Sequence, residues 1–221
     1  MLKTFKIGGV HPPENKLSAA GKIQVLPIPE KVIIPLGQHI GAPAKPIVKK
    51  GDHVLAGQKI AEAGGFVSAP IHSSVSGTVK GIEKRLTAVG AMGDAIIIEN
   101  DGLYESVEYA PAKLSDLSKE DILKRIQEGG VVGQGGAGFP THVKLSPKEP
   151  DKIDHILVNG AECEPYITSD YRRMMEEPES IVGGLEVILK AFPKAVGCIC
   201  IEDNKPDCIA KLTELTKNEP R

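Results

Sequence analysis

The hydrophobic pattern of this 221-residue chain changes at Ser118, and that change limits the folds the chain can adopt. Between residues 37 and 100, short apolar runs alternate with glycine turns, which is typical of an all-β sandwich. After Ser118, helical and strand patterns alternate, which predicts a parallel α/β layer. We therefore expect a two-domain α+β chain with the all-β domain first. The expected α/β elements are a helix over 118–129, strands over 153–158 and 195–201, a helical region over 171–192 broken near Pro178, and a helix over 206–217.

Composition places the expected domain boundaries. Residues 1–36 are rich in proline, which forbids helix, and are expected to form an extended arm that wraps the next domain. Residues 37–100 make the β domain, residues 101–117 a polar linker, and residues 118–221 the α/β domain. A doubly wound sheet usually needs more strands than are expected here, so we expect the α/β domain to be incomplete in this chain.

The charge balance and the scarcity of aromatic residues argue against a nucleic-acid partner. The 27 basic and 29 acidic residues leave no basic footprint for a polyanion, and an aromatic content of 4% is too low for base stacking. No apolar run approaches the roughly 18 residues of a membrane helix, and the N-terminus lacks the apolar core of a signal peptide. We therefore expect a cytosolic chain with no transmembrane segment of its own.

A glycine-rich segment, residues 133–139, is the first candidate site. It holds four glycines in six residues, so several backbone N–H groups can approach one anion without obstruction by Cβ atoms. Lys144 follows and can add positive charge, which favours a phosphate-binding loop; a flexible surface loop is the alternative. The segment is not a Rossmann fingerprint, because no clear strand leads into it. It is not a Walker A loop, because Gly-Lys-[Ser/Thr] is absent.

The second candidate site follows the expected strand over residues 153–158. Ligands of open α/β sheets bind at the carboxyl ends of strands, and Asn159, Glu162 and Glu164 stand at such an end. Their amide and carboxylate groups can bind ribose hydroxyls or a carboxamide. A charged turn before a helix is the alternative, and the pattern favours the binding site slightly.

The four cysteines do not form a recognisable metal site. Cys198 and Cys200 are expected on one face of a strand, where buried thiols are more common than a metal-binding pair. Cys163 lies between two glutamates that disfavour its thiolate, so we do not expect a nucleophile. No Cys-x-x-Cys occurs, so no metal ligand and no catalytic side chain is assigned.

Three segments carry a resemblance to a known family. Residues 133–144 (Gly-x-Gly-Gly-Ala-Gly-Phe-Pro-Thr-x-x-Lys), 159–168 (Asn-Gly-Ala-Glu-Cys-Glu-Pro-Tyr-Ile-Thr) and 6–13 (Lys-x-Gly-Gly-x-His-Pro-Pro) resemble the C subunit of the Rnf ion-translocating electron-transport complex. The first two are similar, more distantly, to the flavin-binding 51-kDa-type subunit of respiratory complex I. Residues 48–60 resemble a biotinyl/lipoyl barrel-sandwich hybrid. The stretch 63–67 holds no lysine for such a group, which argues against a carrier.

The resemblance implies a barrel-sandwich hybrid followed by an incomplete, Rossmann-like domain of the complex I 51-kDa type. It implies FMN, which takes a hydride from NADH and passes electrons to two [4Fe–4S] clusters in a C-terminal part that this chain lacks. The other subunits of the membrane Rnf complex would be partners that exchange electrons with ferredoxin and pump Na⁺ or H⁺. The chain would be peripheral on the cytoplasmic face of the membrane. With part of the site missing, we expect the chain alone to bind FMN weakly or not at all.

Carried over position by position, the resemblance gives each site residue a role. Three loop glycines and the lysine would hold the phosphate side of FMN, the phenylalanine would stack on nicotinamide or adenine, the asparagine would contact the isoalloxazine, and the glutamates would lie near flavin or NADH. The cofactor-binding residues are Gly133, Gly135, Gly136, Gly138, Phe139, Lys144, Asn159, Glu162 and Glu164. At Gln134, Ala161 and Tyr166 the sequence departs from the complex I pattern, which has Arg, Asp and Gly, and fits the Rnf version better.

A non-catalytic scaffold subunit of a redox pump is the alternative function. The A subunit of the Na⁺-translocating NADH:quinone reductase shares the general layout and, as the family resemblance implies, lacks the intact glycine motif. The intact motif over residues 133–139 therefore favours the flavin-binding redox subunit over the scaffold.

Overall fold

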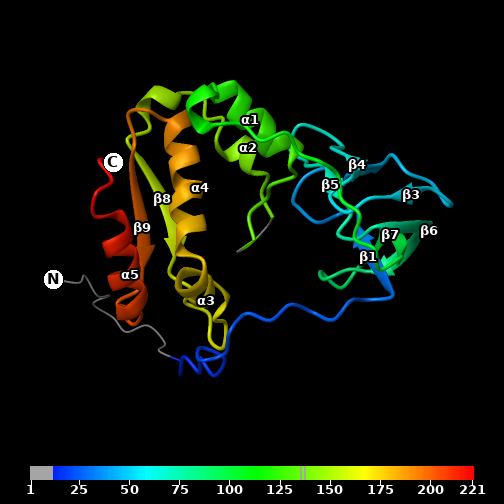
Figure 1. Ribbon diagram of the computed structural model, residues 1–221, viewed down its shortest axis with the longest axis horizontal. Coiled ribbons are helices and arrows are strands. Elements are labelled where there is room, and N and C mark those ends of the chain that lie inside the picture. The colour runs from blue at the N-terminus through cyan, green and yellow to red at the C-terminus, as the bar shows by residue number, and fades with distance from the viewer. Residues whose placement is uncertain (1–11, 135, 137) are drawn as a thin grey trace. The chain divides into compact units, whose positions relative to one another are not determined.

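The computed structural model describes residues 12–134, 136 and 138–221, whose elements are labelled in Figure 1. Contacts divide the chain into two compact units. Residues 26–150 form one unit, and residues 1–25 join residues 151–221 in the other. Among the described residues, no helix is both long and apolar enough to cross a bilayer.

Two antiparallel sheets form the β part of the 26–150 unit and confirm the expected barrel-sandwich fold. One sheet has the order β1-β7-β6-β3 and the other the order β2-β4-β5. Their apolar side chains enclose a core in which Val54, Ile60, Val79 and Ile98 are fully buried. The strands are β1 (Lys31–Pro35), β2 (Lys45–Pro46), β3 (His53–Val54), β4 (Lys59–Glu62), β5 (Ile71–His72), β6 (Gly77–Leu86) and β7 (Met92–Asn100).

Strand β1 lies within the proline-rich stretch that the sequence indicated as an extended arm. Its residues Val32, Ile33 and Ile34 pair with the Ile98, Ile97 and Ile96 run of β7. β1 is an edge strand, which tolerates a proline, and Pro35 ends it. The β-branched run therefore outweighs the neighbouring prolines, whereas residues 12–30 contain no helix or strand.

The helix expected after Ser118 is present in the same unit. The Ser118 hydroxyl accepts the backbone N–H of Asp121, and the Asp121 carboxylate accepts the backbone N–H of Ser118 in return. This capping box satisfies two N–H groups that the first helical turn leaves unpaired. The helix ends at Gly129, as predicted. The remaining elements of this region are α1 (Lys119–Glu128), α2 (Thr141–Lys144) and the 3₁₀ turns η1 (Leu114–Asp116) and η2 (Pro150–Lys152).

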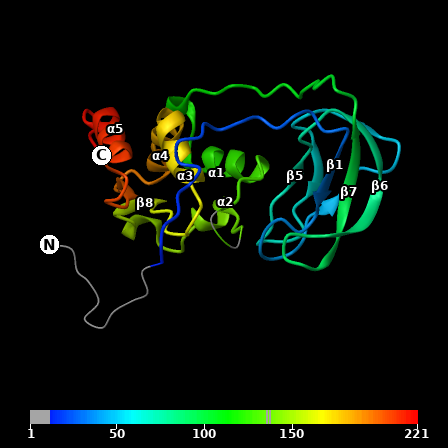
Figure 2. The same ribbon diagram turned by 90° about the horizontal axis from the view of Figure 1, so that it is seen from below.

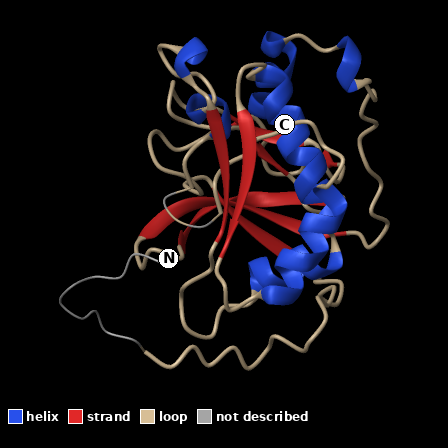
Figure 3. Cartoon of the chain, turned by 90° about the vertical axis from the view of Figure 1, so that its left-hand side faces the viewer, coloured by secondary structure: helices blue, strands red, loops and turns tan. Residues whose placement is uncertain are grey.

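The second unit is built on two parallel strands, as the alternating pattern predicted. Strands β8 (His155–Gly160) and β9 (Val196–Ile201) pair in register and run side by side (Figure 3). Helices α3 (Ser169–Glu176), α4 (Pro178–Ala191) and α5 (Pro206–Thr216) cover one face of the pair (Figure 2). Their buried side chains pack on the strands, and burial of each large apolar side chain contributes about 1.5–3 kcal/mol. The core of this layer contains Met174, Val182, Cys208 and Leu212, with Ile199 and Ile201 against it.

The helical region breaks where the sequence predicted. Helix α3 ends at Glu176, and Pro178 is the first residue of α4. Proline has no N–H to continue the preceding helix and disfavours helical backbone at the residue before it, but it is well suited to a first helical position. One continuous helical pattern thus becomes two helices.

The other face of the β8–β9 pair is uncovered within the described part of its unit, and this corrects one prediction. Leu157 is 66% exposed, Val196 is 44% exposed and Cys200 is exposed, while Cys198 is half-buried. The two thiols were expected to be buried, but they alternate with Ile199, which takes the helix-covered face. The prediction that they share one face is consistent with this alternation. The prediction that they are buried is wrong.

Candidate functional site

The glycine-rich segment forms a loop closed at its base. Val132 and Pro140 make an isolated antiparallel bridge, and Thr141 N–H donates to the Val131 carbonyl at 2.9 Å. Gly133 N–H donates to the Phe139 carbonyl at 3.0 Å. The Gly133 N–H therefore maintains the shape of the loop and is not free for an anion.

The described loop glycines serve two different purposes. Gly138 is buried with a φ of +64°, and a Cβ there would lie 2.8 Å from the Gln38 carbonyl oxygen, so the fold itself requires glycine. Gly136 is exposed, and a Cβ added to it would meet nothing within 4 Å. Gly135, which the sequence also assigns to the phosphate, lies outside the described residues.

Lys144 brings positive charge to the loop, as the spacing predicted. It lies on α2, and its Nζ is 3.0 Å from the position that a Cβ on Gly133 would take. The N–H groups of Gly136 and Gly138 have no acceptor within the described part of the chain. A lysine ammonium beside backbone N–H groups is a donor set that fits a phosphate. Phe139 is half-buried at the end of this loop.

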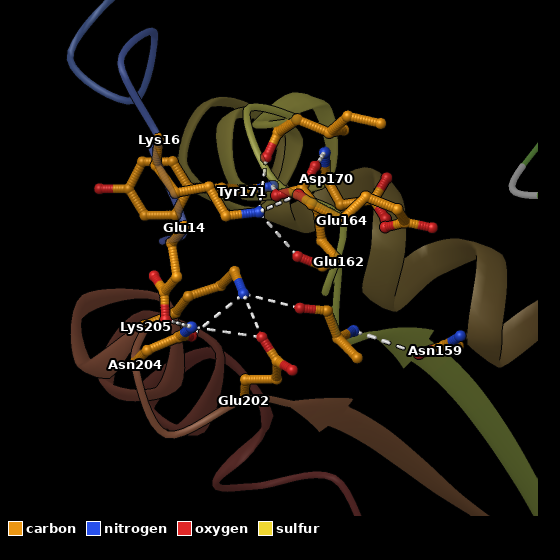
Figure 4. Close-up of polar contacts among 12 residues, drawn as sticks. Glu14, Lys16, Asn159, Glu162, Glu164, Asp170, Tyr171, Glu202, Asn204 and Lys205 are labelled. Atoms are coloured by element: carbon orange, nitrogen blue, oxygen red, sulfur yellow. Dashed lines mark hydrogen bonds and ion pairs between the residues drawn. The ribbon is translucent and has the colours of Figure 1, made fainter. Parts of the chain in front are cut away.

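The second candidate segment follows the carboxyl end of β8 in the other unit. The side chain of Asn159 is exposed, and its Oδ1 accepts the backbone N–H of Ala161 at 3.1 Å. Its amide nitrogen points away from this turn (Figure 4). Glu164 is exposed, and its carboxylate makes no hydrogen bond within the described residues. Asn159 and Glu164 therefore present polar groups that a ligand can reach.

Glu162 has a structural position that its sequence motif did not indicate. It is 6% exposed, and its Oε1 accepts the backbone N–H of Asp170 at 2.6 Å. Its Oε2 accepts the N–H of Tyr171 at 3.1 Å, so the carboxylate caps the N-terminus of α3. Burial, followed by the Glu162 and Glu164 carboxylates, raises the pKa of Asp170.

Two lysines that sequence reasoning missed hold the loop after β8. Lys16 Nζ donates to the carbonyl oxygens of Glu162 and Glu164, at 2.8 and 2.9 Å (Figure 4). Lys205 is 5% exposed, and its Nζ donates to the Ala161 carbonyl at 2.6 Å and to Glu202 Oε2 at 3.1 Å. Both are single lysines in segments without a periodic pattern, so no signal in the sequence identifies their role.

A cavity of about 420 Å³ lies beside this loop, within the same unit. Its walls include Glu14, Thr168, Asn204 and the Tyr171–Asp207 pair. The Tyr171 hydroxyl donates to Asp207 Oδ2 at 2.6 Å, and this bond raises the pKa of Tyr171 and lowers the pKa of Asp207. The cavity lies by the carboxyl ends of β8 and β9, where open α/β sheets bind ligands.

The structure shows how far each cysteine is exposed. Cys163 and Cys200 are exposed, and no cluster of three or more metal-ligating side chains occurs among the described residues. Cys208 is a buried residue of α5, and burial raises the pKa of its thiol to about 11. At neutral pH this thiol is therefore protonated and packs as an apolar group.

Family models match both parts of the chain. Residues 3–103 match the RnfC barrel sandwich hybrid domain, and residues 126–221 match the Nuo51 FMN-binding domain. The chain belongs to the RnfC family. This agrees with the resemblance carried by the glycine loop and by the segment after β8, and with the two folds that the structure shows.

Relatives with curated names extend across almost the whole chain. The chain is 48% identical, over 95% of its length, to the C subunit of the proton-translocating ferredoxin:NAD(+) oxidoreductase complex of Clostridium ljungdahlii. It is 44% identical, over 99% of its length, to the C subunit of the Na(+)-translocating ferredoxin:NAD(+) oxidoreductase complex of Acetobacterium woodii. The chain spans 46% and 50% of these two relatives, about half of their length.

Proposed function

We propose that this chain supplies the flavin-binding part of an electron-transfer subunit in a membrane ion-pumping NADH:ferredoxin oxidoreductase. FMN, when bound, would take a hydride from NADH and release single electrons to iron–sulfur clusters outside this chain. The role of the chain is to bind, orient and shield the flavin. The observation that carries the proposal is the loop over residues 133–139, with Lys144 beside it and the unpaired N–H group of the exposed Gly136.

The proposed contacts divide between the two segments. The N–H groups of Gly136 and Gly138, with Lys144, bind the FMN phosphate, and Gly133 closes the loop. Phe139 stacks on a nicotinamide or adenine ring. Asn159 and Glu164 contact the isoalloxazine or NADH, and their exposed, polar side chains support this. Glu162 acts through the backbone instead, because its carboxylate caps α3.

The chain is proposed to work as a peripheral subunit on the cytoplasmic face of the membrane. Its named relatives are the C subunits of ion-translocating complexes, which supports membrane subunits as partners. A scaffold subunit that binds no flavin would not need unpaired N–H groups or a cation at the glycine loop. Gly136 and Lys144 therefore favour the redox role.

The direct test of activity uses a protein that carries this chain together with the second half found in its relatives. We expect NADH-dependent reduction of ferricyanide that requires added FMN, followed as loss of ferricyanide absorbance. The same protein reconstituted with riboflavin is the control, since it lacks the phosphate that the loop binds. Equal rates with and without flavin, or no NADH oxidation in a protein that retains FMN, would contradict the proposal.

A further inference from the structure

The segment over residues 14–23 makes its contacts with the α/β layer of its own unit. Lys16 Nζ donates to the carbonyls of Glu162, Glu164 and Ile167, at 2.8, 2.9 and 2.8 Å. An ammonium group has three protons, so the three bonds use its full donor capacity. One side chain thus fixes the loop after β8 at three points, and Figure 4 shows the Lys16 ammonium among these carbonyls.

Further contacts attach the same segment on both sides of Lys16. The Glu14 carbonyl accepts the N–H of Tyr166 at 2.9 Å, and the Ser18 hydroxyl lies 2.7 Å from that of Thr168. Other bonds reach α3 and the loop after β9: Arg172 donates to the Ala19 carbonyl at 3.1 Å, Glu176 accepts the N–H of Ile23 at 3.0 Å, and Asn204 donates to Glu14 at 3.0 Å.

The loop needs this support because its backbone is strained and its own hydrogen bonds are few. Glu162 and Tyr166 have φ values of +52° and +68°, a region that residues other than glycine rarely adopt. Such conformations persist only where the surroundings enforce them. Lys16 binds the carbonyl of Glu162 itself and carbonyls on both sides of Tyr166, so it stabilises the conformation of the loop at both strained residues.

We propose that Lys16 is a positioning residue for the cofactor-binding segment after β8, and that residues 14–23 are an integral part of the α/β domain. The proposal rests on the proposed flavin site for its functional consequence. Lys16 touches no cofactor atom in this account. It holds the backbone of Glu164 in the position from which that side chain contacts flavin or NADH, so its loss lowers affinity through disorder of the loop.

The test replaces Lys16 with Met, which keeps the length of the side chain and removes the ammonium. Hydrogen exchange is measured on the 221-residue chain without cofactor. We expect exchange of the amides over residues 161–168 to become about tenfold faster or more, with little change at β8 and β9. Lys211→Met is the matched control, because Lys211 Nζ also donates to a backbone carbonyl, that of Met175, at 2.6 Å. Lys16→Arg is expected to recover part of the protection.

FMN binding, measured with the same substitutions in a protein that carries this chain together with the second half found in its relatives, separates the two ideas. If the wild-type protein binds FMN and Lys16→Met binds it about tenfold less tightly while Lys211→Met does not, both are supported. If none of these proteins binds FMN but the loop still loses protection in Lys16→Met, the positioning role stands and the flavin site fails. Unchanged exchange over residues 161–168 in Lys16→Met overturns the inference. If Lys16→Met does not fold, the test uses Ser18→Ala, which removes the hydroxyl contact to Thr168 and is expected to speed amide exchange next to Thr168. Exchange as slow as in the wild type would then overturn the inference.

Discussion

Replacing Gly136 with valine is expected to weaken FMN binding about 10- to 100-fold and to leave the stability of the chain unchanged. A Cβ at this position meets nothing within 4 Å, so the protein itself has room for the side chain. A phosphate bound against the exposed side of the loop would leave no room for the valine side chain. The phosphate would then lose one or two charge-assisted hydrogen bonds, which accounts for the expected 10- to 100-fold loss of affinity. The measurements are FMN titration and urea unfolding of one preparation of a protein that carries this chain together with the second half found in its relatives.

Gly138→Ala is the matched contrast within the same loop. Its Cβ would lie 2.8 Å from the Gln38 carbonyl, and its φ of +64° disfavours any residue with a side chain. We expect this variant to lose stability even without FMN. If Gly136→Val instead destabilises the chain, or binds FMN as wild type does, the open side of the loop is not a phosphate site.

Glu162→Ala is expected to lower the free energy of unfolding by about 2 kcal/mol, measured by urea denaturation. The substitution leaves the N–H groups of Asp170 and Tyr171 without an acceptor at the start of α3, and unsatisfied buried donors cost about 1–3 kcal/mol. Glu164→Ala is the control. Its carboxylate is exposed, so stability should change by less than about 0.5 kcal/mol while ligand affinity falls. An equal loss of stability in the two variants would contradict the roles assigned to these glutamates.

Local rules in the sequence were enough to predict most of the fold. The helix start at Ser118, the helix break at Pro178 and the parallel strands β8 and β9 all follow from contacts between near neighbours or from simple periodicity. Cys200 was placed wrongly, because burial of a strand face depends on what packs against it. The composition of the strand does not contain that information.

The sequence predicted the chemical groups of the candidate site but not the contacts that hold its loops in place. The glycine loop and Lys144 lie close in the sequence, and the structure brings them together. By contrast, Lys16 is separated from Glu162 by most of the chain, so no local pattern reveals their contact. Glu162 was predicted as a ligand contact because its motif shows a carboxylate at a strand end. The Glu162 carboxylate instead points at the N-terminus of α3, and that orientation depends on how the helix packs in the folded chain.

The central claim is that the loop over residues 133–139 binds the phosphate of FMN. The most direct measurement is a pair of NMR titrations of the ¹⁵N-labelled chain, one with FMN and one with riboflavin, because amide shifts report binding even when it is weak. We expect FMN to shift the amide signals of Gly136 and Gly138, and riboflavin, which lacks the phosphate, to leave both signals in place. Equal shifts with both flavins would contradict the claim, as would loop signals that FMN leaves unmoved in a protein that also carries the second half found in the relatives of this chain.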